Sequence, residues 1–159
     1  MSRLQLALNV DDLETSIAFY STLFATEPHK VRPGYANFAV AEPPLKLVLV
    51  ENAGQGGSIN HLGVEVGDVG TVDAELARLA AAGLATTEER DTTCCHAQQD
   101  KFWVQGTPDG ERWEVYTVLA DSVTAGGPVE GNDCNCGIAT QTAEARGDEL
   151  VTAQSRCCS

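Results

Sequence analysis

A strand–helix–strand pattern occurs twice in this chain, and this repeat constrains the fold more than any other feature. The first copy starts with Gln5–Val10 and the second with His61–Val66, and in both stretches apolar residues alternate with other residues, as in a half-buried strand. A segment with helical spacing of apolar residues follows each stretch, over residues 12–24 and 71–84. The chain therefore contains one β–α–β unit repeated, with a potential metal ligand at the first position of each copy.

The remaining elements complete the two copies. Strands are predicted over Tyr35–Val40 and Leu45–Glu51 in the first copy and over Lys101–Val104 and Arg112–Val118 in the second, with residues 86–93 as a short strand or an extended loop. The copies span residues 1–54 and 58–119 and together form one domain over residues 1–119. Residues 120–159 contain no aromatic residue and little apolar periodicity, so they are expected to form a flexible tail.

Two local predictions concern the first copy. Asp11, with Glu14 three residues later, is the expected N-cap of the first helix. If the two copies are aligned, Leu47 takes the position that Glu114 has in the second copy, so an apolar residue is expected there.

Composition excludes several classes of partner. The formal net charge of −13 over 159 residues disfavours binding to nucleic acid or to an anionic membrane surface. No window is long and apolar enough to span a bilayer, and the N-terminus lacks the apolar core of a signal peptide. These features favour a cytoplasmic location, in which thiols stay reduced.

Three residues on separate strands form a candidate metal site. Gln5 and His61 begin the first strand of each copy, and Glu114 lies in the last strand of the second copy among apolar and aromatic residues. Together they offer an amide oxygen, an imidazole nitrogen and a carboxylate, which is a variant of the two-histidine, one-carboxylate iron site. The alternative is that His61 and Gln5 are ordinary hydrogen-bonded residues and that Glu114 forms a salt bridge with Arg112 or Lys101.

The chain also has six cysteines, grouped in three clusters. Cys94 and Cys95 are adjacent on a predicted loop and are followed by His96, a candidate base. Adjacent cysteines are poorly placed for a disulfide with each other, since their Cα atoms lie about 3.8 Å apart. Two thiols on a loop can instead bind one thiophilic centre, such as trivalent arsenic or Cd(II), although both could also be small buried residues. The other cysteines lie in the tail: Cys134, Cys136, Cys157 and Cys158.

These motifs resemble the vicinal oxygen chelate superfamily of glyoxalases, extradiol dioxygenases and bleomycin-resistance proteins. The resemblance is closest to the branch of organoarsenical carbon–arsenic lyases and cadmium-induced proteins. The matching segments cover the whole predicted domain: Gln5–Leu8, Asp12–Glu14, Arg32–Ala39, Glu42–Leu49, Asn60–Val66, Thr92–Cys95, Gln99–Lys101 and Trp113–Leu119. The Thr-Thr-Cys-Cys sequence that ends at Cys95 is specific to this branch.

The resemblance implies an α+β fold in which paired βαβββ modules form a curled mixed sheet around a metal cleft. Gln5, His61 and Glu114 would hold a non-haem Fe(II), and Cys94 and Cys95 would capture a trivalent methyl- or aryl-arsenical. The implied reaction is O2-dependent cleavage of the carbon–arsenic bond to release arsenite, by a monomer or a homodimer. Two other interpretations remain: a cadmium- or arsenite-binding resistance protein without turnover, and a glyoxalase-like enzyme.

Overall fold

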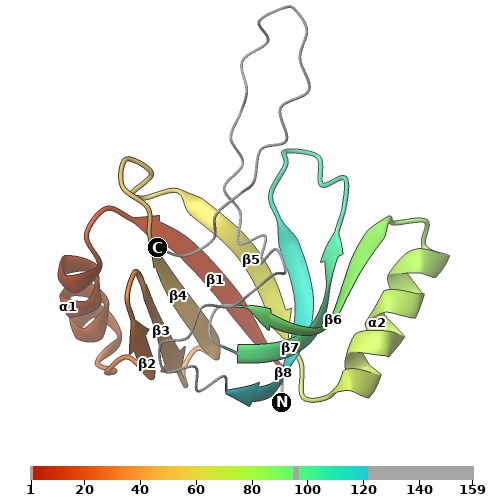
Figure 1. Cartoon of the computed structure of the whole chain (residues 1–159), viewed down its shortest axis with the longest axis horizontal. Helices are drawn as coiled ribbons and strands as arrows, with labels where there is room; N and C mark the ends of the chain where they lie inside the picture. The colour runs from red at the N-terminus through yellow and green to blue at the C-terminus, as the bar shows by residue number, and fades with distance from the viewer. Residues whose placement is uncertain (1, 95–96, 122–159) are drawn as a thin grey trace, which may run out of the picture.

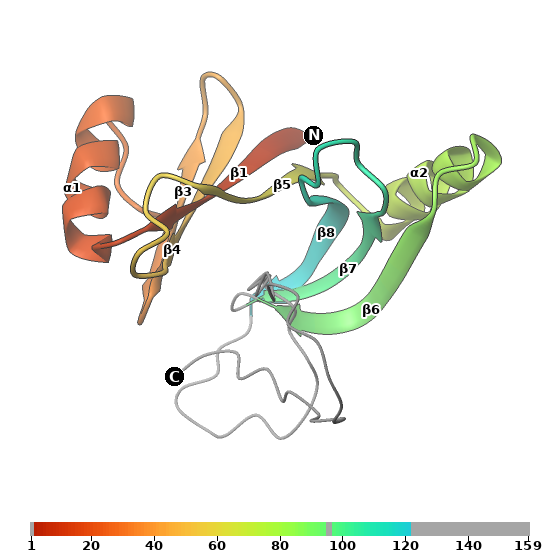
Figure 2. The ribbon, with the colours of Figure 1, turned by 90° about the horizontal axis from the view of Figure 1, so that it is seen from above.

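One curled sheet with a helix at either end forms the body of the protein (Figures 1 and 2). The computed structural model describes residues 2–94 and 97–121. In chain order the elements are β1 (Arg3–Val10), α1 (Leu13–Phe24), β2 (Lys30–Arg32), β3 (Tyr35–Val40), β4 (Leu45–Glu51), β5 (Ile59–Glu65), α2 (Val69–Ala81), β6 (Thr86–Cys94), β7 (Ala97–Val104) and β8 (Trp113–Asp121). The order confirms the expected α+β fold of two βαβββ modules. No helix in this part of the chain is long and apolar enough to cross a membrane.

The two modules are related by their strand pairing. The eight strands lie in the order β2-β3-β4-β1-β5-β8-β7-β6, with β1 parallel to β4 in the first module and β5 parallel to β8 in the second. The modules join through an antiparallel ladder between β1 and β5. A single chain therefore forms the complete curled sheet, with the first strands of both modules at its centre.

Each helix covers the outer face of its own module. In the first module, α1 packs on a cluster that includes Leu47, Leu49 and Phe38, and in the second, α2 packs on Phe102 and Val115. Because side chains alternate between the faces of a strand, the other face of the sheet is left for a different set of residues. That inner face carries most of the buried polar side chains, among them Gln5, His61, Lys101 and Glu114.

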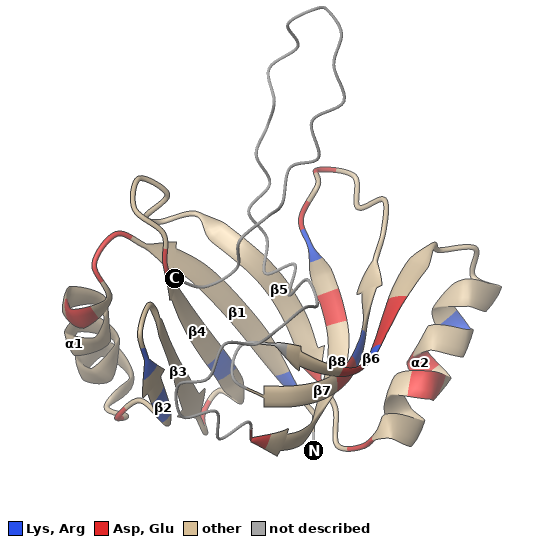
Figure 3. Ribbon diagram, viewed as in Figure 1, with Lys and Arg blue, Asp and Glu red and all other residues tan. Residues whose placement is uncertain are grey.

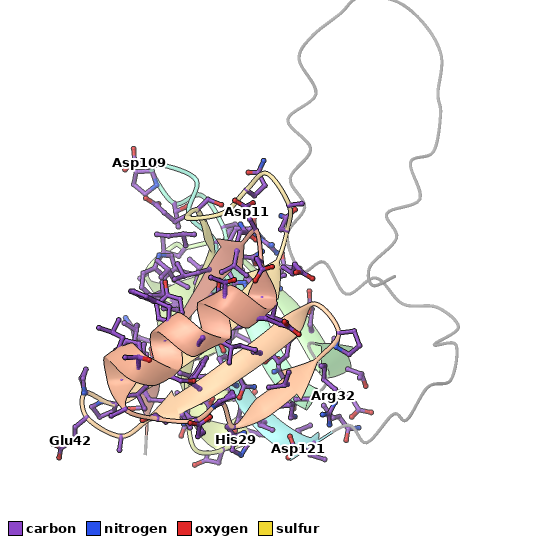
Figure 4. The ribbon with its side chains drawn as sticks, turned by 90° about the vertical axis from the view of Figure 1, so that its left-hand side faces the viewer. Asp11, His29, Arg32, Glu42, Asp109 and Asp121 are labelled. Carbon is purple, nitrogen blue, oxygen red and sulfur yellow. The ribbon has the colours of Figure 1, made fainter. Side chains whose placement is uncertain are left out.

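The start of α1 differs from the predicted one. Asp12, not Asp11, is the N-cap, and its carboxylate accepts a hydrogen bond from the backbone N–H of Thr15. Asp11 lies in the loop before the helix (Figure 4), and its carboxylate accepts hydrogen bonds from the backbone N–H groups of Gly54 and Gly56. Of these two adjacent acidic residues, Asp11 binds the linker between the modules, and Asp12 caps the helix.

Other element boundaries also moved. Helix α2 begins at Val69, earlier than predicted, because Asp68 caps it through the backbone N–H of Thr71. Residues 86–94 form a strand, β6, through antiparallel pairing with β7. The prediction that Leu47 is the first-module equivalent of Glu114 was wrong by one residue. Since Gly63 pairs with Glu114 and its counterpart Ala7 pairs with Val48, the position belongs to Val48, which is also apolar and buried.

Candidate functional site

The three predicted metal ligands come together on the inner face of the sheet. Gln5 on β1, His61 on β5 and Glu114 on β8 are each at most 4% exposed. The Gln5 Nε2 atom lies 2.9 Å from His61 Nε2 and 2.8 Å from Glu114 Oε1, and His61 Nε2 lies 3.5 Å from Glu114 Oε1. Three strands that are distant in sequence thus direct three polar atoms at one buried point.

Two residues fix the position of the His61 ring. Its Nδ1 atom lies 2.6 Å from Asn60 Oδ1. Trp103 packs against the ring edge-on, with the centroids 5.7 Å apart. These contacts leave His61 Nε2 facing Gln5 and Glu114.

The amide of Gln5 is held from the other side by Tyr116. The Tyr116 hydroxyl oxygen lies 2.5 Å from Gln5 Oε1 and 2.8 Å from Glu65 Oε2. In this orientation the Gln5 amide nitrogen serves both His61 and Glu114 as a hydrogen-bond donor. A half-turn about the terminal bond would exchange nitrogen and oxygen with little change in shape, because the two atoms are nearly the same size.

Glu114 is also paired with a buried cation. Lys101 on β7 is 2% exposed, and its Nζ lies 3.2 Å from Glu114 Oε2 and 3.4 Å from Glu89 Oε2. The salt-bridge alternative for Glu114 therefore holds for Lys101, whereas the guanidinium of Arg112 lies over the Trp103 ring, 4.3 Å from its centroid. Glu114 uses one oxygen for Lys101 and directs the other at Gln5 and His61, so the two interpretations are compatible.

Gly63 provides the space between the converging side chains of Gln5 and Glu114. It lies two residues after His61 on the same face of β5 and pairs with both Gln5 and Glu114 across the sheet. A Cβ atom at this position would lie 3.1 Å from the Glu114 side chain and 3.3 Å from Gln5 Nε2. Any larger residue would crowd the point at which the three polar atoms meet.

A second polar group beneath the ligands was missed from the sequence. Glu65 accepts hydrogen bonds from Arg3 and Tyr116 and forms an ion pair with Lys46. Burial raises the pKa of Glu65, but the charge of Lys46 and the hydrogen bonds of Tyr116 and Arg3 outweigh it, so that the net pKa is lowered. Burial, reinforced by the charges of Glu65 and Glu114, raises the pKa of Tyr116 well above its ordinary value. The alternation His61, Gly63, Glu65 was the available signal for Glu65.

An open pocket of about 410 Å³ adjoins the site on the side of Trp103. Its lining residues come from β6, β7 and the turn before β8: Thr87, Glu89, Trp103, Gln105, Thr107 and Arg112. Trp103 also contacts a second cation, since Lys101 Nζ lies 4.7 Å from its ring centroid. Charged side chains are distributed over the strands, and acidic ones also over both helices (Figure 3).

The predicted thiol site is only partly described. Cys94 is the last residue of β6 and pairs with Ala97, the first residue of β7. Cys95 and His96 lie outside the described residues, as do Cys134, Cys136, Cys157 and Cys158. Strand β7 continues from this hairpin to Lys101 and Trp103, so the hairpin and the site share one strand. Within the described ranges, no group of three or more His, Cys, Asp or Glu side chains is placed to hold a metal ion. The group of Gln5, His61 and Glu114 differs from such a group because it contains a glutamine.

Comparisons with known proteins identify the family of the chain. A family model described as the glyoxalase/bleomycin resistance protein/dioxygenase superfamily matches residues 3–115. The cadmium-induced protein CadI of Mycobacterium tuberculosis is 66% identical over 140 residues, which are 88% of this chain and 91% of that protein. A trivalent organoarsenical cleaving enzyme of Thermomonospora curvata is 63% identical over 125 residues, or 78% of this chain and 82% of that protein.

Solved structures show the same fold at low sequence identity. An extradiol ring-cleaving dioxygenase from B. fuscum matches with a TM-score of 0.56 and 20% identity, over 75% of this chain and 33% of that one. The Mn(II)-bound glyoxalase from Novosphingobium aromaticivorans matches with a TM-score of 0.55 and 23% identity, over 77% of this chain and 42% of that one.

Proposed function

The chain belongs to the glyoxalase/bleomycin resistance protein/dioxygenase superfamily, and from this premise we propose that it is an Fe(II)- and O2-dependent enzyme that cleaves the carbon–arsenic bond of trivalent organoarsenicals to release arsenite. The observation that carries the proposal is the convergence of Gln5, His61 and Glu114 in a protein 63% identical to one named as a trivalent organoarsenical cleaving enzyme. Methyl- and aryl-arsenicals are the proposed substrates.

The donor set fits a divalent iron. His61 offers a nitrogen lone pair, Glu114 offers a carboxylate oxygen, and Gln5 offers an amide oxygen once its amide has turned. Three such donors on one side of an ion are typical of non-haem Fe(II) enzymes of the facial-triad type. Bound there, Fe(II) would supply open positions at which dioxygen can be activated.

Tyr116 supports the ligating orientation of Gln5. The tyrosine has one hydroxyl hydrogen, yet its oxygen lies within hydrogen-bond distance of two acceptors, Gln5 Oε1 and Glu65 Oε2. If the hydrogen goes to the Glu65 carboxylate, the tyrosine oxygen becomes an acceptor, and Gln5 must direct its N–H at it. Gln5 Oε1 then faces His61 Nε2 and Glu114 Oε1, an arrangement of three acceptors that a bound metal cation would stabilise.

Cys94 and Cys95 are the proposed substrate-binding residues. Trivalent arsenic with one carbon substituent has two exchangeable positions, which two thiolates can fill. Strand β7, which begins with the partner of Cys94, also contains Lys101 and Trp103, so one strand connects the thiols to the proposed metal site. Bringing the thiol-bound arsenical to that site would supply much of the rate by proximity.

Sequestration without turnover is the second candidate, favoured by the 66% identity to a cadmium-induced protein. In that function the thiols bind cadmium or arsenite, and the Gln5, His61 and Glu114 group is not needed. A glyoxalase-like reaction has less support, since it requires no adjacent cysteines.

Two variants separate these functions. His61→Ala and Cys94→Ser are each mixed with trivalent methylarsenical, and bound arsenic, free arsenite and iron content are measured. The proposed enzyme loses turnover in both variants, keeps its arsenical binding in His61→Ala and keeps its iron in Cys94→Ser. If the wild type binds arsenic tightly without releasing arsenite, the protein sequesters arsenic. If Cys94→Ser retains full turnover, the thiol role is wrong.

A further inference from the structure

We propose that a one-way chain of hydrogen bonds from the linker between the modules to His61 fixes the metal-binding tautomer of this histidine. The chain runs from the Gln55 carbonyl through Ser58, Asn9 and Asn60 to His61. Three of these side chains are positioning residues that touch neither substrate nor metal in the proposed site. The inference rests on the proposed function, because it explains how one of the proposed iron ligands is prepared.

The direction of this chain of hydrogen bonds is set at the end far from His61, where a backbone carbonyl can only accept a hydrogen bond. The Ser58 hydroxyl lies 2.7 Å from the backbone carbonyl oxygen of Gln55, so its single hydrogen is donated there. The Ser58 oxygen can then only accept from Asn9, which lies 2.8 Å away. Asn9 must therefore direct its Nδ2 at Ser58 and its Oδ1 the other way.

Each later step follows from the one before it. Asn9 Oδ1 lies 2.8 Å from the side chain of Asn60, so Asn60 must donate through its Nδ2. Asn60 Oδ1 then faces His61 Nδ1 at 2.6 Å, and this nitrogen must carry the hydrogen. A neutral imidazole has one N–H, so Nε2 keeps its lone pair and faces Gln5 and Glu114. The orientations of the buried Asn9 and Asn60 side-chain amides are thus both determined by these hydrogen bonds.

The far end of the chain is itself held in place. The backbone N–H of Ser58 also donates to the Gln55 carbonyl, and Gln55 donates to the carbonyl of Asn52. Asp11 binds the N–H groups of Gly54 and Gly56 in the same turn. The linker is therefore a folded turn, which gives the acceptor at Gln55 a fixed position.

The first module has no such chain, and none is required there. Leu4 takes the place of Asn60 before the first ligand, and it is half exposed. Gln5 is an amide, which has no tautomer to select. The asymmetry between the copies follows the chemistry of the two ligands, as expected if the chain of hydrogen bonds serves His61.

The test reads the tautomer directly in the metal-free protein. Nitrogen-15 NMR of the imidazole, under mildly alkaline conditions and with the His61 signals identified by their loss in His61→Ala, distinguishes a protonated from a non-protonated nitrogen. In wild type we expect Nδ1 to be protonated and Nε2 to be non-protonated. In Asn60→Leu we expect mixed tautomers and an affinity for Co(II), used as a probe of the iron site, about 10- to 100-fold weaker.

Ser58→Ala is the second variant, since Ser58 is only half buried and does not touch His61. Removal of its hydroxyl should shift the tautomer in the same direction and weaken Co(II) binding about five-fold, the effect of one ordinary hydrogen bond. Asn52→Ala is the matched control, because Asn52 reaches Asn9 only at 3.4 Å and lies outside the chain. It should match wild type in both measurements.

The outcomes separate this inference from the proposed function. A wild-type His61 protonated at Nε2, or an Asn60→Leu variant with unchanged tautomer and affinity, would overturn the inference. If the tautomers behave as expected but wild type binds no Co(II) or Fe(II), the metal proposal fails and the hydrogen-bond chain stands. If Ser58→Ala behaves like Asn52→Ala, the directing role ends at Asn60 and the linker has no part in it.

Discussion

Among single residues, each polar side chain of the site is costly to bury, and each has a partner that offsets the cost of its desolvation. Glu114 has Lys101 on one oxygen, His61 has Asn60 on its outer nitrogen, and Gln5 has Tyr116. A buried carboxylate without a partner would cost several kcal/mol, on the order of 3–5 when one member of a buried pair is removed. The buried Lys101 ammonium group, 3.2 Å from Glu114 Oε2, therefore compensates for the burial of this carboxylate.

Replacement of Lys101 by methionine should separate stability from metal binding. In the metal-free protein, Lys101→Met leaves Glu114 without its cation, and the free energy of unfolding should fall by about 3–5 kcal/mol. Added Fe(II) or Co(II) should restore more stability to this variant than to wild type. The control is Lys30→Met, which removes an ion pair with the exposed Asp121 and should cost less than about 1 kcal/mol. Equal urea midpoints for metal-free Lys101→Met and wild type would contradict the pairing.

Gly63→Ala should weaken the metal site without unfolding the protein. The added Cβ would press on Glu114 and Gln5, so metal affinity should fall on the order of tenfold. Gly70→Ala in α2 is the matched control, since its nearest neighbour is the Asp68 carboxylate at 3.2 Å and not a ligand. Titration with Co(II) measures both variants, and an unchanged affinity in Gly63→Ala would show that the ligands do not need this space.

The sequence predicted that Gln5, His61 and Glu114 form one site and that Lys101 could pair with Glu114, but it did not predict the partners of Gln5 and His61. Gln5 and His61 were visible because they occupy the same position in a repeat, and Glu114 because it interrupts an apolar strand. Tyr116 gave no signal, since a tyrosine in an apolar strand is usually a core residue. Its contact with Glu65 depends on the parallel register between β5 and β8, which no local pattern contains.

Among elements, the ladder between β1 and β5 determines how the two modules meet. Arg3 and Glu65 are direct partners across this ladder and form a hydrogen-bonded ion pair at 2.9 Å. Lys46 on β4 reaches the same carboxylate at 3.1 Å. Glu65 thus ties together three strands from both modules directly beneath the proposed metal ligands.

This junction should make stability dependent on pH in the acid range. The pKa of Glu65 is lowered in the folded protein, so its contribution is present above its unfolded value of about 4.5 and is lost as the pH falls through the folded value. Glu65→Gln should therefore be less stable than wild type near neutral pH, and the difference should shrink as the pH falls below about 4.5. Urea unfolding across this pH range measures the effect. A difference that stays constant with pH would contradict the assignment.

Element prediction failed mainly where a long-range contact competed with a local signal. Asp11 and Asp12 are equally good caps by sequence, and the linker that binds Asp11 is more than 40 residues away. Strand β2 has only three residues, too short for an alternating pattern to show. For residues 86–93 the sequence left a short strand and an extended loop open, and pairing with β7 makes this polar segment a strand.

In the molecule as a whole, one chain supplies both halves of the curled sheet. The repeat predicted two modules, but it did not predict whether they pair within one chain or between two. In the described residues, the β1–β5 ladder joins the two modules within the same chain. Both helix-covered clusters of the core lie within residues 2–121.

Removal of the residues after Asp121 should leave the domain folded. Strand β8 extends to Asp121, which pairs with Ala97, so a chain of residues 1–121 keeps every described strand. Its circular dichroism spectrum and thermal midpoint should be close to those of the full chain, which is the control. The prediction is wrong if the shortened protein is unfolded, in which case residues 122–159 are needed for stability.

We propose that the protein breaks a carbon–arsenic bond with iron and oxygen, and that the adjacent thiols hold the arsenic. Arsenic speciation after mixing Fe(II)-loaded protein with trivalent methylarsenical tests it directly, in air, without oxygen, and with Cys94→Ser in air. Arsenite should form only in air and only when Cys94 is present. Tight binding of arsenic with no arsenite under any of these conditions would contradict the claim and identify a sequestering protein.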